Sequence, residues 1–106
     1  MEIIRRCCCR GCGQKTIRYN ELKNLMYQYN VIIIDVRSQQ EYYEGHYDGA
    51  INIPLFELKK KIGERVRDKN QIIVVYCSAG IRSMKAQNML NIMGYSNVYN
   101  LIPGYQ

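Results

Sequence analysis

Long hydrophobic runs are missing from this sequence. The longest uninterrupted apolar stretches, VIII at 31–34 and IIVVY at 72–76, are far too short to span a bilayer. The opening residues, MEIIRRCCCRGCG, contain no apolar run of the length that a secretory signal requires. We therefore expect a cytoplasmic location and no membrane partner.

Acidic residues are also scarce. Nine Asp and Glu residues stand against fifteen Lys and Arg residues, for a formal net charge of +6. Much of the excess lies in residues 1–18, where five basic residues accompany only Glu2, and the rest of the chain is mildly basic. This distribution is typical of a basic tail on a near-balanced domain. It favours small anionic substrates, and no nucleic-acid partner is expected.

Histidine occurs only once, and this limits how the five cysteines can be interpreted. Cytosolic thiols stay reduced, so cysteines there are catalytic, metal-binding or incidental rather than structural. Three adjacent cysteines cannot easily all face one ion, so no metal site is expected. Tetrahedral zinc and a Cys9-x-x-Cys12 redox pair stay as alternatives to an incidental flexible segment. Cys77 stands alone, and the other four crowd the N-terminus: Cys7, Cys8, Cys9 and Cys12.

The apolar pattern predicts strands that alternate with helices. Segments 31–36 (VIIIDV) and 71–77 (QIIVVYC) are continuous β-branched runs, as in strands buried on both faces of a parallel sheet. Helices must then cover both faces. The remaining signals predict outer strands at 16–19 and 97–101, a strand at 50–53, a helix at 21–29 capped by Asn20, and helices at 38–45, 55–66 and 83–94.

A chain of 106 residues is long enough for one core and too short for two. We interpret residues 1–15 as a flexible Cys/Arg-rich segment and residues 16–106 as one α/β domain. The continuous β-branched runs favour a mostly parallel sheet in this domain.

The second buried strand ends at an isolated cysteine. Sites in open α/β sheets form at the carboxyl ends of strands, and Cys77 lies between such a strand and a helix. The loop N–H groups and the helix N-terminus stabilise a thiolate or a bound anion. Arg82 lies in the first turn of the helix, where a cation opposes the dipole, so a negative group is expected nearby. A nucleophilic cysteine fits these features, but a small buried residue that completes its strand fits the spacing equally well.

Three segments resemble the rhodanese domain family. IIIDVRSQQEYYEGHYDGAINIP at 32–54 is similar to its first signature, VVYCSAGIRS at 74–83 to its active-site loop, and LNIMGYSNVYNLIPG at 90–104 to its C-terminal helix and last strand. The match runs from residue 16 to residue 104 and implies a rhodanese-like fold with a mostly parallel five-stranded sheet. The chain departs from the family at Tyr47, where an aliphatic residue is usual, and at Pro103-Gly104, where the family has Gly-Gly.

The resemblance implies a single-domain sulfurtransferase without a cofactor. Such domains take a sulfane sulfur from an anionic donor such as thiosulfate onto the loop cysteine as a persulfide. They pass it to cyanide, a thiol or a partner protein. On this chain the resemblance makes Cys77 the nucleophile and Ser83 the residue that orients the loop. The donor-binding cradle comprises the backbone N–H groups of Ser78, Ala79, Gly80, Ile81 and Arg82, with added charge from Arg82.

Other residues of the first signature are expected to support the loop rather than to react. Asp35, Arg37 and Glu41 are expected to form an ion-paired support beneath it, with direct substrate contact by Arg37 as the alternative. His46, at the family's Gly-His position, is expected to make a structural hydrogen bond rather than act as a general base.

Two other classes of function remain open at this point. One is a binding or regulatory module that keeps the fold without turnover. The other is a cysteine-dependent phosphatase, which also combines a strand-end cysteine, an N–H cradle and an arginine. The phosphatase signature is Cys-x5-Arg, whereas Cys77 and Arg82 are separated by four residues, and the shorter loop favours a single outer sulfur over a phosphoryl group.

Overall fold

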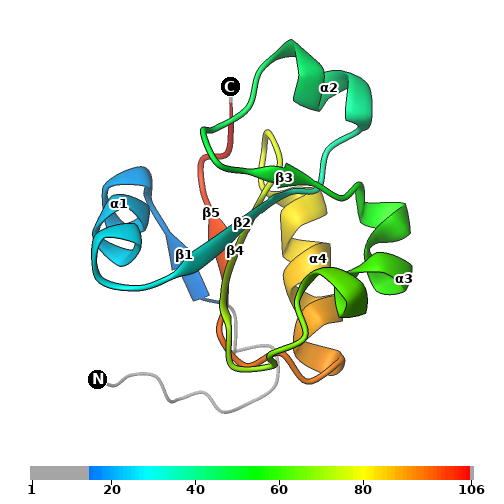
Figure 1. Cartoon of the computed structure of the whole chain (residues 1–106). Coiled ribbons are helices and arrows are strands. Elements are labelled where there is room, and N and C mark those ends of the chain that lie inside the picture. Colours follow the sequence, from blue (N-terminus) through cyan, green and yellow to red (C-terminus); the bar gives the residue numbers. More distant parts are fainter. Residues whose placement is uncertain (1–14, 106) are drawn as a thin grey trace.

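The computed structural model describes residues 15–105, which form a five-stranded parallel sheet with helices on both faces (Figure 1). The strands lie in the order β1-β5-β4-β2-β3. Along the chain the elements are β1 (Lys15–Ile17), α1 (Tyr19–Gln28), β2 (Val31–Asp35), α2 (Gln39–Glu44), β3 (Ile51–Asn52), α3 (Leu55–Arg65), β4 (Ile72–Tyr76), α4 (Ile81–Ile92) and β5 (Val98–Leu101). The predicted five-stranded α/β architecture is confirmed, and β1 begins one residue before the predicted domain boundary.

Alternate residues of the central strands divide the core into two layers. In β4, Ile73 and Val75 pack with α3 and α4, whereas Val74 and Tyr76 pack with Leu22 of α1 on the other face. Successive strand residues point to opposite faces, so both faces of a central strand must be apolar. This requirement explains the continuous β-branched runs of β2 and β4.

The structure corrects the prediction that residues 97–101 form an outer strand. Strand β5 is hydrogen-bonded to β1 on one side and to β4 on the other, so the outer strands are β1 and β3. The Asn100 side chain in this strand is 1% exposed, and its Nδ2 donates to the carbonyl oxygen of Gly80 at 3.4 Å in the loop after β4.

The start of α1 also differs from the prediction. Asn20 was expected to cap the helix, but the helix already begins at Tyr19. The side chain of Glu21 takes up the backbone N–H of Arg18 at 2.8 Å, so the first turn is closed without Asn20. Among residues 15–105, no helix is both long and apolar enough to cross a membrane.

Candidate active site

The thiol of Cys77 lies in a ring of donors between β4 and α4. Cys77 is 1% exposed and continues the β4 alternation, so its side chain faces the α3 and α4 side of the sheet. The backbone N–H groups of Gly80 and Ser83 point at Sγ, with N–S distances of 3.1 and 3.4 Å. The Ser83 hydroxyl lies 3.4 Å from Sγ. Gly80 has φ +98°, a left-handed conformation that favours glycine and turns the loop into the helix.

These donors decide the acidity of the thiol. Burial by itself raises the pKa of Cys77, because a charged sulfur is poorly solvated there. The hydroxyl of Ser83 and the backbone N–H groups of Ser83, Gly80 and Arg82 act in the opposite direction and outweigh burial. The pKa of Cys77 is therefore below its ordinary value, which favours the nucleophilic thiolate.

Arg82 is paired with Glu41 of α2. Nη1 donates to Oε1 at 2.7 Å and Nη2 to Oε2 at 3.2 Å, a two-point contact between residues far apart in the sequence. Glu41 also accepts the backbone N–H of Ser38 at 3.0 Å. The hydrogen bonds from Arg82 and then from Ser38 lower the pKa of Glu41 to about 2. Glu41 is thus a negative group of the kind expected beside Arg82.

Asp35 and Arg37 form a separate, buried ion pair. Nη2 of Arg37 lies 2.7 Å from Oδ2 of Asp35, and the backbone N–H of Arg37 donates to Oδ1 at 2.8 Å. Nη2 also donates to the carbonyl oxygen of Gly45 at 2.6 Å. The guanidinium lies over the rings of Tyr76 and Tyr105, at 5.7 and 5.1 Å from their centroids. The expected three-residue support is therefore divided into two pairs, and only Glu41 contacts the loop through Arg82.

The remaining predicted residues lie around these pairs. His46 Nδ1 is 2.8 Å from the carbonyl oxygen of Tyr42, and the two rings stack with centroids 3.7 Å apart. Arg82 Nη2 donates to the hydroxyl of Ser78 at 3.4 Å. Ala79 follows Ser78 in the loop, and Ile81 opens α4 with its side chain exposed.

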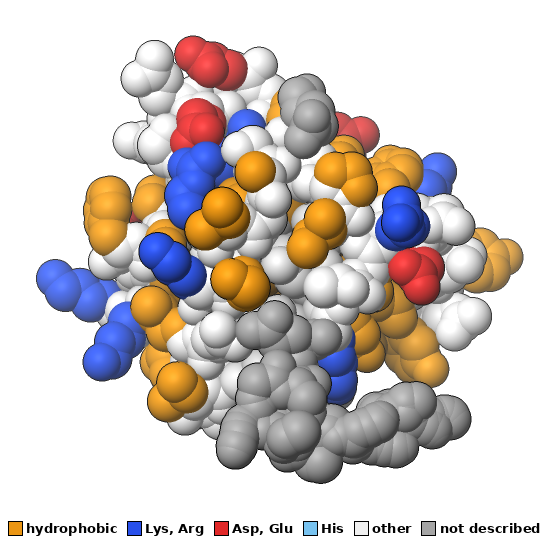
Figure 2. Space-filling model, turned by 180° about the vertical axis from the view of Figure 1, so that it is seen from behind, with side chains coloured by type: hydrophobic (Ala, Val, Ile, Leu, Met, Phe, Trp, Pro, Cys, Tyr) orange, Lys and Arg blue, Asp and Glu red, His pale blue; other side chains and the backbone are white. Residues whose placement is uncertain are grey.

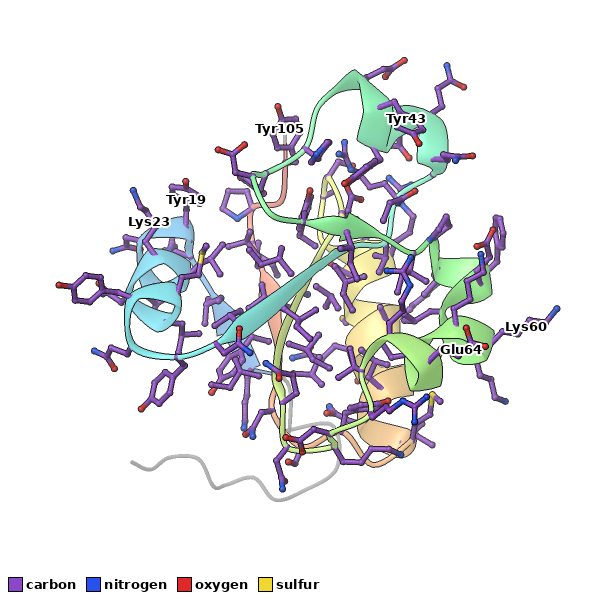
Figure 3. The ribbon with its side chains drawn as sticks, viewed as in Figure 1. Tyr19, Lys23, Tyr43, Lys60, Glu64 and Tyr105 are labelled. Carbon is purple, nitrogen blue, oxygen red and sulfur yellow. The ribbon has the colours of Figure 1, made fainter. Side chains whose placement is uncertain are left out.

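Gly104, which the sequence marked only as part of a departure from the family pattern, lies against the backbone of Cys77. A Cβ on Gly104 would overlap the carbonyl oxygen of Cys77 and lie 2.6 Å from its carbonyl carbon. The next residue is Tyr105, which Figure 3 labels. Its backbone N–H donates to the same carbonyl oxygen of Cys77 at 2.9 Å. The Tyr47 hydroxyl donates to the carbonyl oxygen of Gly104 at 3.2 Å. The sequence did point to these residues, because Tyr47 and Pro103-Gly104 are the two places where the chain departs from the family pattern.

Metal-binding clusters are not found in the part of the chain that the structure describes: no group of three or more His, Cys, Asp or Glu residues there could hold an ion. Cys77 is a free cysteine. The four N-terminal cysteines, and with them the zinc and redox-pair alternatives, lie outside the described residues.

Fold and site together define a class of protein: a parallel α/β domain with a buried thiol held by N–H donors at the N-terminus of a helix. The family model for the rhodanese-like domain matches residues 19–106. The chain belongs to the rhodanese-like family.

Relatives within this family carry different names. The chain is 49% identical over 67 residues to thiosulfate sulfurtransferase PspE of Escherichia coli (strain K12), covering 63% of this chain and 64% of the relative. It is 33% identical over 88 residues to tRNA uridine(34) hydroxylase of Buchnera aphidicola subsp. Baizongia pistaciae (strain Bp), covering 79% and 28%. The solved structure of the human single-domain sulfurtransferase TSTD1 matches with a TM-score of 0.75 and 25% identity, covering 85% and 90%. The chain spans less than two thirds of either curated relative.

Proposed function

We propose that this chain is a rhodanese-type sulfurtransferase in which Cys77 is the nucleophile and the persulfide carrier. In the first step the Cys77 thiolate attacks the sulfane sulfur of a small anionic donor such as thiosulfate. The donor's S–S bond breaks, and sulfite leaves with the electron pair of that bond. In the second step cyanide, a thiol or a protein thiol attacks the outer sulfur, and Cys77 leaves as a thiolate. The cycle returns the protein to its starting state without a cofactor.

The observation that carries this proposal is the set of donors around Cys77 Sγ. Two backbone N–H groups lie within 3.4 Å of the sulfur, and the Ser83 hydroxyl is equally close. A preorganised donor set stabilises negative charge on Sγ before attack and again when Cys77 leaves. A persulfide anion bound in the same loop is stabilised by the same helix N-terminus.

The flanking loop residues complete the proposed site. We assign donor binding to the loop residues Ser78, Ala79, Ile81 and Arg82 as well as Gly80. Hydrogen bonding to Glu41 raises the pKa of Arg82, and the charge on Cys77 raises it further, so the guanidinium stays positive and is attracted to the reacting sulfur. We assign supporting roles to Asp35, Arg37, Glu41 and His46.

Acceptor identity does not follow from family membership, because the relatives include a thiosulfate sulfurtransferase and a tRNA uridine(34) hydroxylase. A cytoplasmic location stays a prediction from the sequence.

The test is intact mass spectrometry after thiosulfate treatment, combined with thiosulfate:cyanide turnover. The wild type should gain one sulfur atom that peptide mapping places on Cys77, and Cys77→Ser should gain none and lose turnover. A variant with serine at the four N-terminal cysteines is the matched control and should keep both properties. The wild type should hydrolyse p-nitrophenyl phosphate negligibly. Turnover retained by Cys77→Ser would disprove the proposal. A wild-type protein that is folded but takes up no sulfur would instead indicate a binding module.

A further inference from the structure

Exposed apolar side chains lie on the first turns of α3 and α4 and against the loop after β4. Helices α3 and α4 follow β3 and β4 and pack against each other, so their first turns lie at the carboxyl edge of the sheet (Figure 1). Cys77 directly follows β4 at this edge. Phe56 in the first turn of α3 is 82% exposed, and Ile81 at the start of α4 is 61% exposed.

Two further apolar residues extend this surface. Met84 lies one turn after Ile81 on the outside of α4 and is 37% exposed. Ile102 is 38% exposed and lies against the loop, with its Cδ1 3.4 Å from the position of a Cβ on Gly80. We call Ile81, Met84 and Ile102, which lie close together at the start of α4, the apolar rim; Phe56 is on the neighbouring helix α3. Clusters of exposed apolar side chains mark interaction sites.

Basic residues lie beside Phe56 on α3 and beside the apolar rim on α4. Lys59 and Lys60 lie one turn after Phe56, and Lys85 lies one turn after Ile81, all of them exposed. Figure 3 shows Lys60 pointing outward from α3. In Figure 2, which views the molecule from behind, hydrophobic side chains gather in the middle of the face with basic side chains between and beside them.

The charge differs between the two halves of the sequence. Residues 55–92, which include α3 and α4, contain eight basic and three acidic residues. Residues 15–54, which include α1 and α2, contain four basic and five acidic residues. Charge of one sign attracts the opposite sign during encounter, so the exposed Lys59, Lys60 and Lys85 on α3 and α4 favour an acidic partner.

We propose that the physiological sulfur acceptor is a protein whose cysteine is surrounded by acidic and apolar side chains, and that it docks on the apolar rim and its lysines. This inference rests on the proposed function. The partner's thiol loses its proton to solvent, and its thiolate attacks the outer sulfur of the Cys77 persulfide. The bond between the two persulfide sulfurs breaks, Cys77 leaves as a thiolate, and the partner carries the new persulfide.

The composition of the rim favours a protein over the two other kinds of acceptor. Ile81, Met84 and Ile102 offer a protein apolar surface to bury, whereas an RNA base needs a flat ring to stack on, and these three side chains have no ring. A small acceptor such as cyanide gains nothing from apolar side chains on the outside of two helices. A protein that buries the rim removes its exposed area from water.

The test measures sulfur transfer from protein that has been loaded with thiosulfate. The probes are a synthetic peptide with one cysteine flanked by aspartate and leucine residues, the same peptide with lysine in place of aspartate, and cyanide. The aspartate peptide should react about tenfold faster than the lysine peptide at low ionic strength, and salt should reduce this ratio.

Charge-reversal variants locate the effect on the protein. Lys85→Glu and Met84→Glu should each slow transfer to the aspartate peptide and leave cyanide turnover unchanged. Lys23→Glu makes the same charge change on α1, on the opposite side of the sheet, and should alter neither rate (Figure 3).

Each other outcome has a distinct meaning. Equal rates with the two peptides, together with normal cyanide turnover, would overturn the docking inference and leave the proposed function standing. Absence of any persulfide would remove the proposed function itself. If the peptides react equally and a short RNA binds with an affinity that Lys85→Glu abolishes, the face is a nucleic-acid surface and the inference is wrong.

Discussion

Replacing Gly104 with alanine should destabilise the domain and disturb the sulfur site, because the added methyl group has no space. The new Cβ would overlap the carbonyl oxygen of Cys77, lie 2.6 Å from its carbonyl carbon and 3.2 Å from the carbonyl oxygen of Ser78. All three are backbone atoms, so no side chain can rotate away. Either the C-terminal segment or the end of β4 must move.

The magnitude follows from what such a movement breaks. Moving the segment away loses the hydrogen bond from the Tyr105 N–H to the carbonyl oxygen of Cys77, 2.9 Å in the native fold, and loosens the 3.2 Å bond from Tyr47 to Gly104. Each net hydrogen bond contributes about 1 kcal/mol and overpacking costs about 1–3 kcal/mol, so we expect a loss of about 3 kcal/mol in the free energy of unfolding. For a domain of this size that corresponds to a melting temperature lower by about 12 °C or more.

Thermal and urea unfolding followed by circular dichroism measure this effect, and Gly63→Ala is the matched control. Gly63 is exposed in α3, and a Cβ there has no neighbour within 4 Å. Alanine in a helix interior is favoured over glycine by about 0.5–1 kcal/mol, so the same substitution should stabilise the protein at this site. If Gly104→Ala melted within about 2 °C of the wild type, the close approach between Gly104 and Cys77 would be refuted.

Two further variants test the electrostatics of the site. Ser83→Ala removes one hydroxyl donor from the sulfur and should raise the pKa of Cys77, which an iodoacetamide pH profile measures; an unchanged midpoint would contradict the assigned hydrogen bond. Glu41→Gln removes the partner of Arg82, and the folded-state pKa of Glu41 is about 2, below its ordinary value of 4.5. The contribution of the pair is therefore present above pH 4.5 and lost as the pH falls towards about 2. The variant should be less stable by up to about 1 kcal/mol at neutral pH, since the pair is partly exposed, and should match the wild type near pH 2 in urea titrations; a constant difference across this range would argue against the pair.

Much of the fold was predictable because its signals are local. The β-branched runs of β2 and β4 predict strands buried on both faces, and the structure contains them within a parallel five-stranded sheet. The position of Cys77 between β4 and α4 was also predictable, because a strand, a glycine-containing loop and a helix follow one another directly in the chain. The prediction that β5 is an outer strand was wrong, because the hydropathy of a segment does not specify its place in the order of strands.

The amino-acid sequence by itself therefore determined the α/β class, the chain order of the elements and the placement of the thiol at the head of a helix. It also indicated that Arg82 needs a negative neighbour, but only the tertiary structure decided that Glu41 is such a neighbour. The approach of Gly104 to Cys77 and that of Ile102 to Gly80 likewise depend on packing. Each joins residues that are distant in the chain, and no local propensity specifies which distant segments meet. Which distant residues meet is decided by the burial of the two faces of the sheet and by the strand order that results.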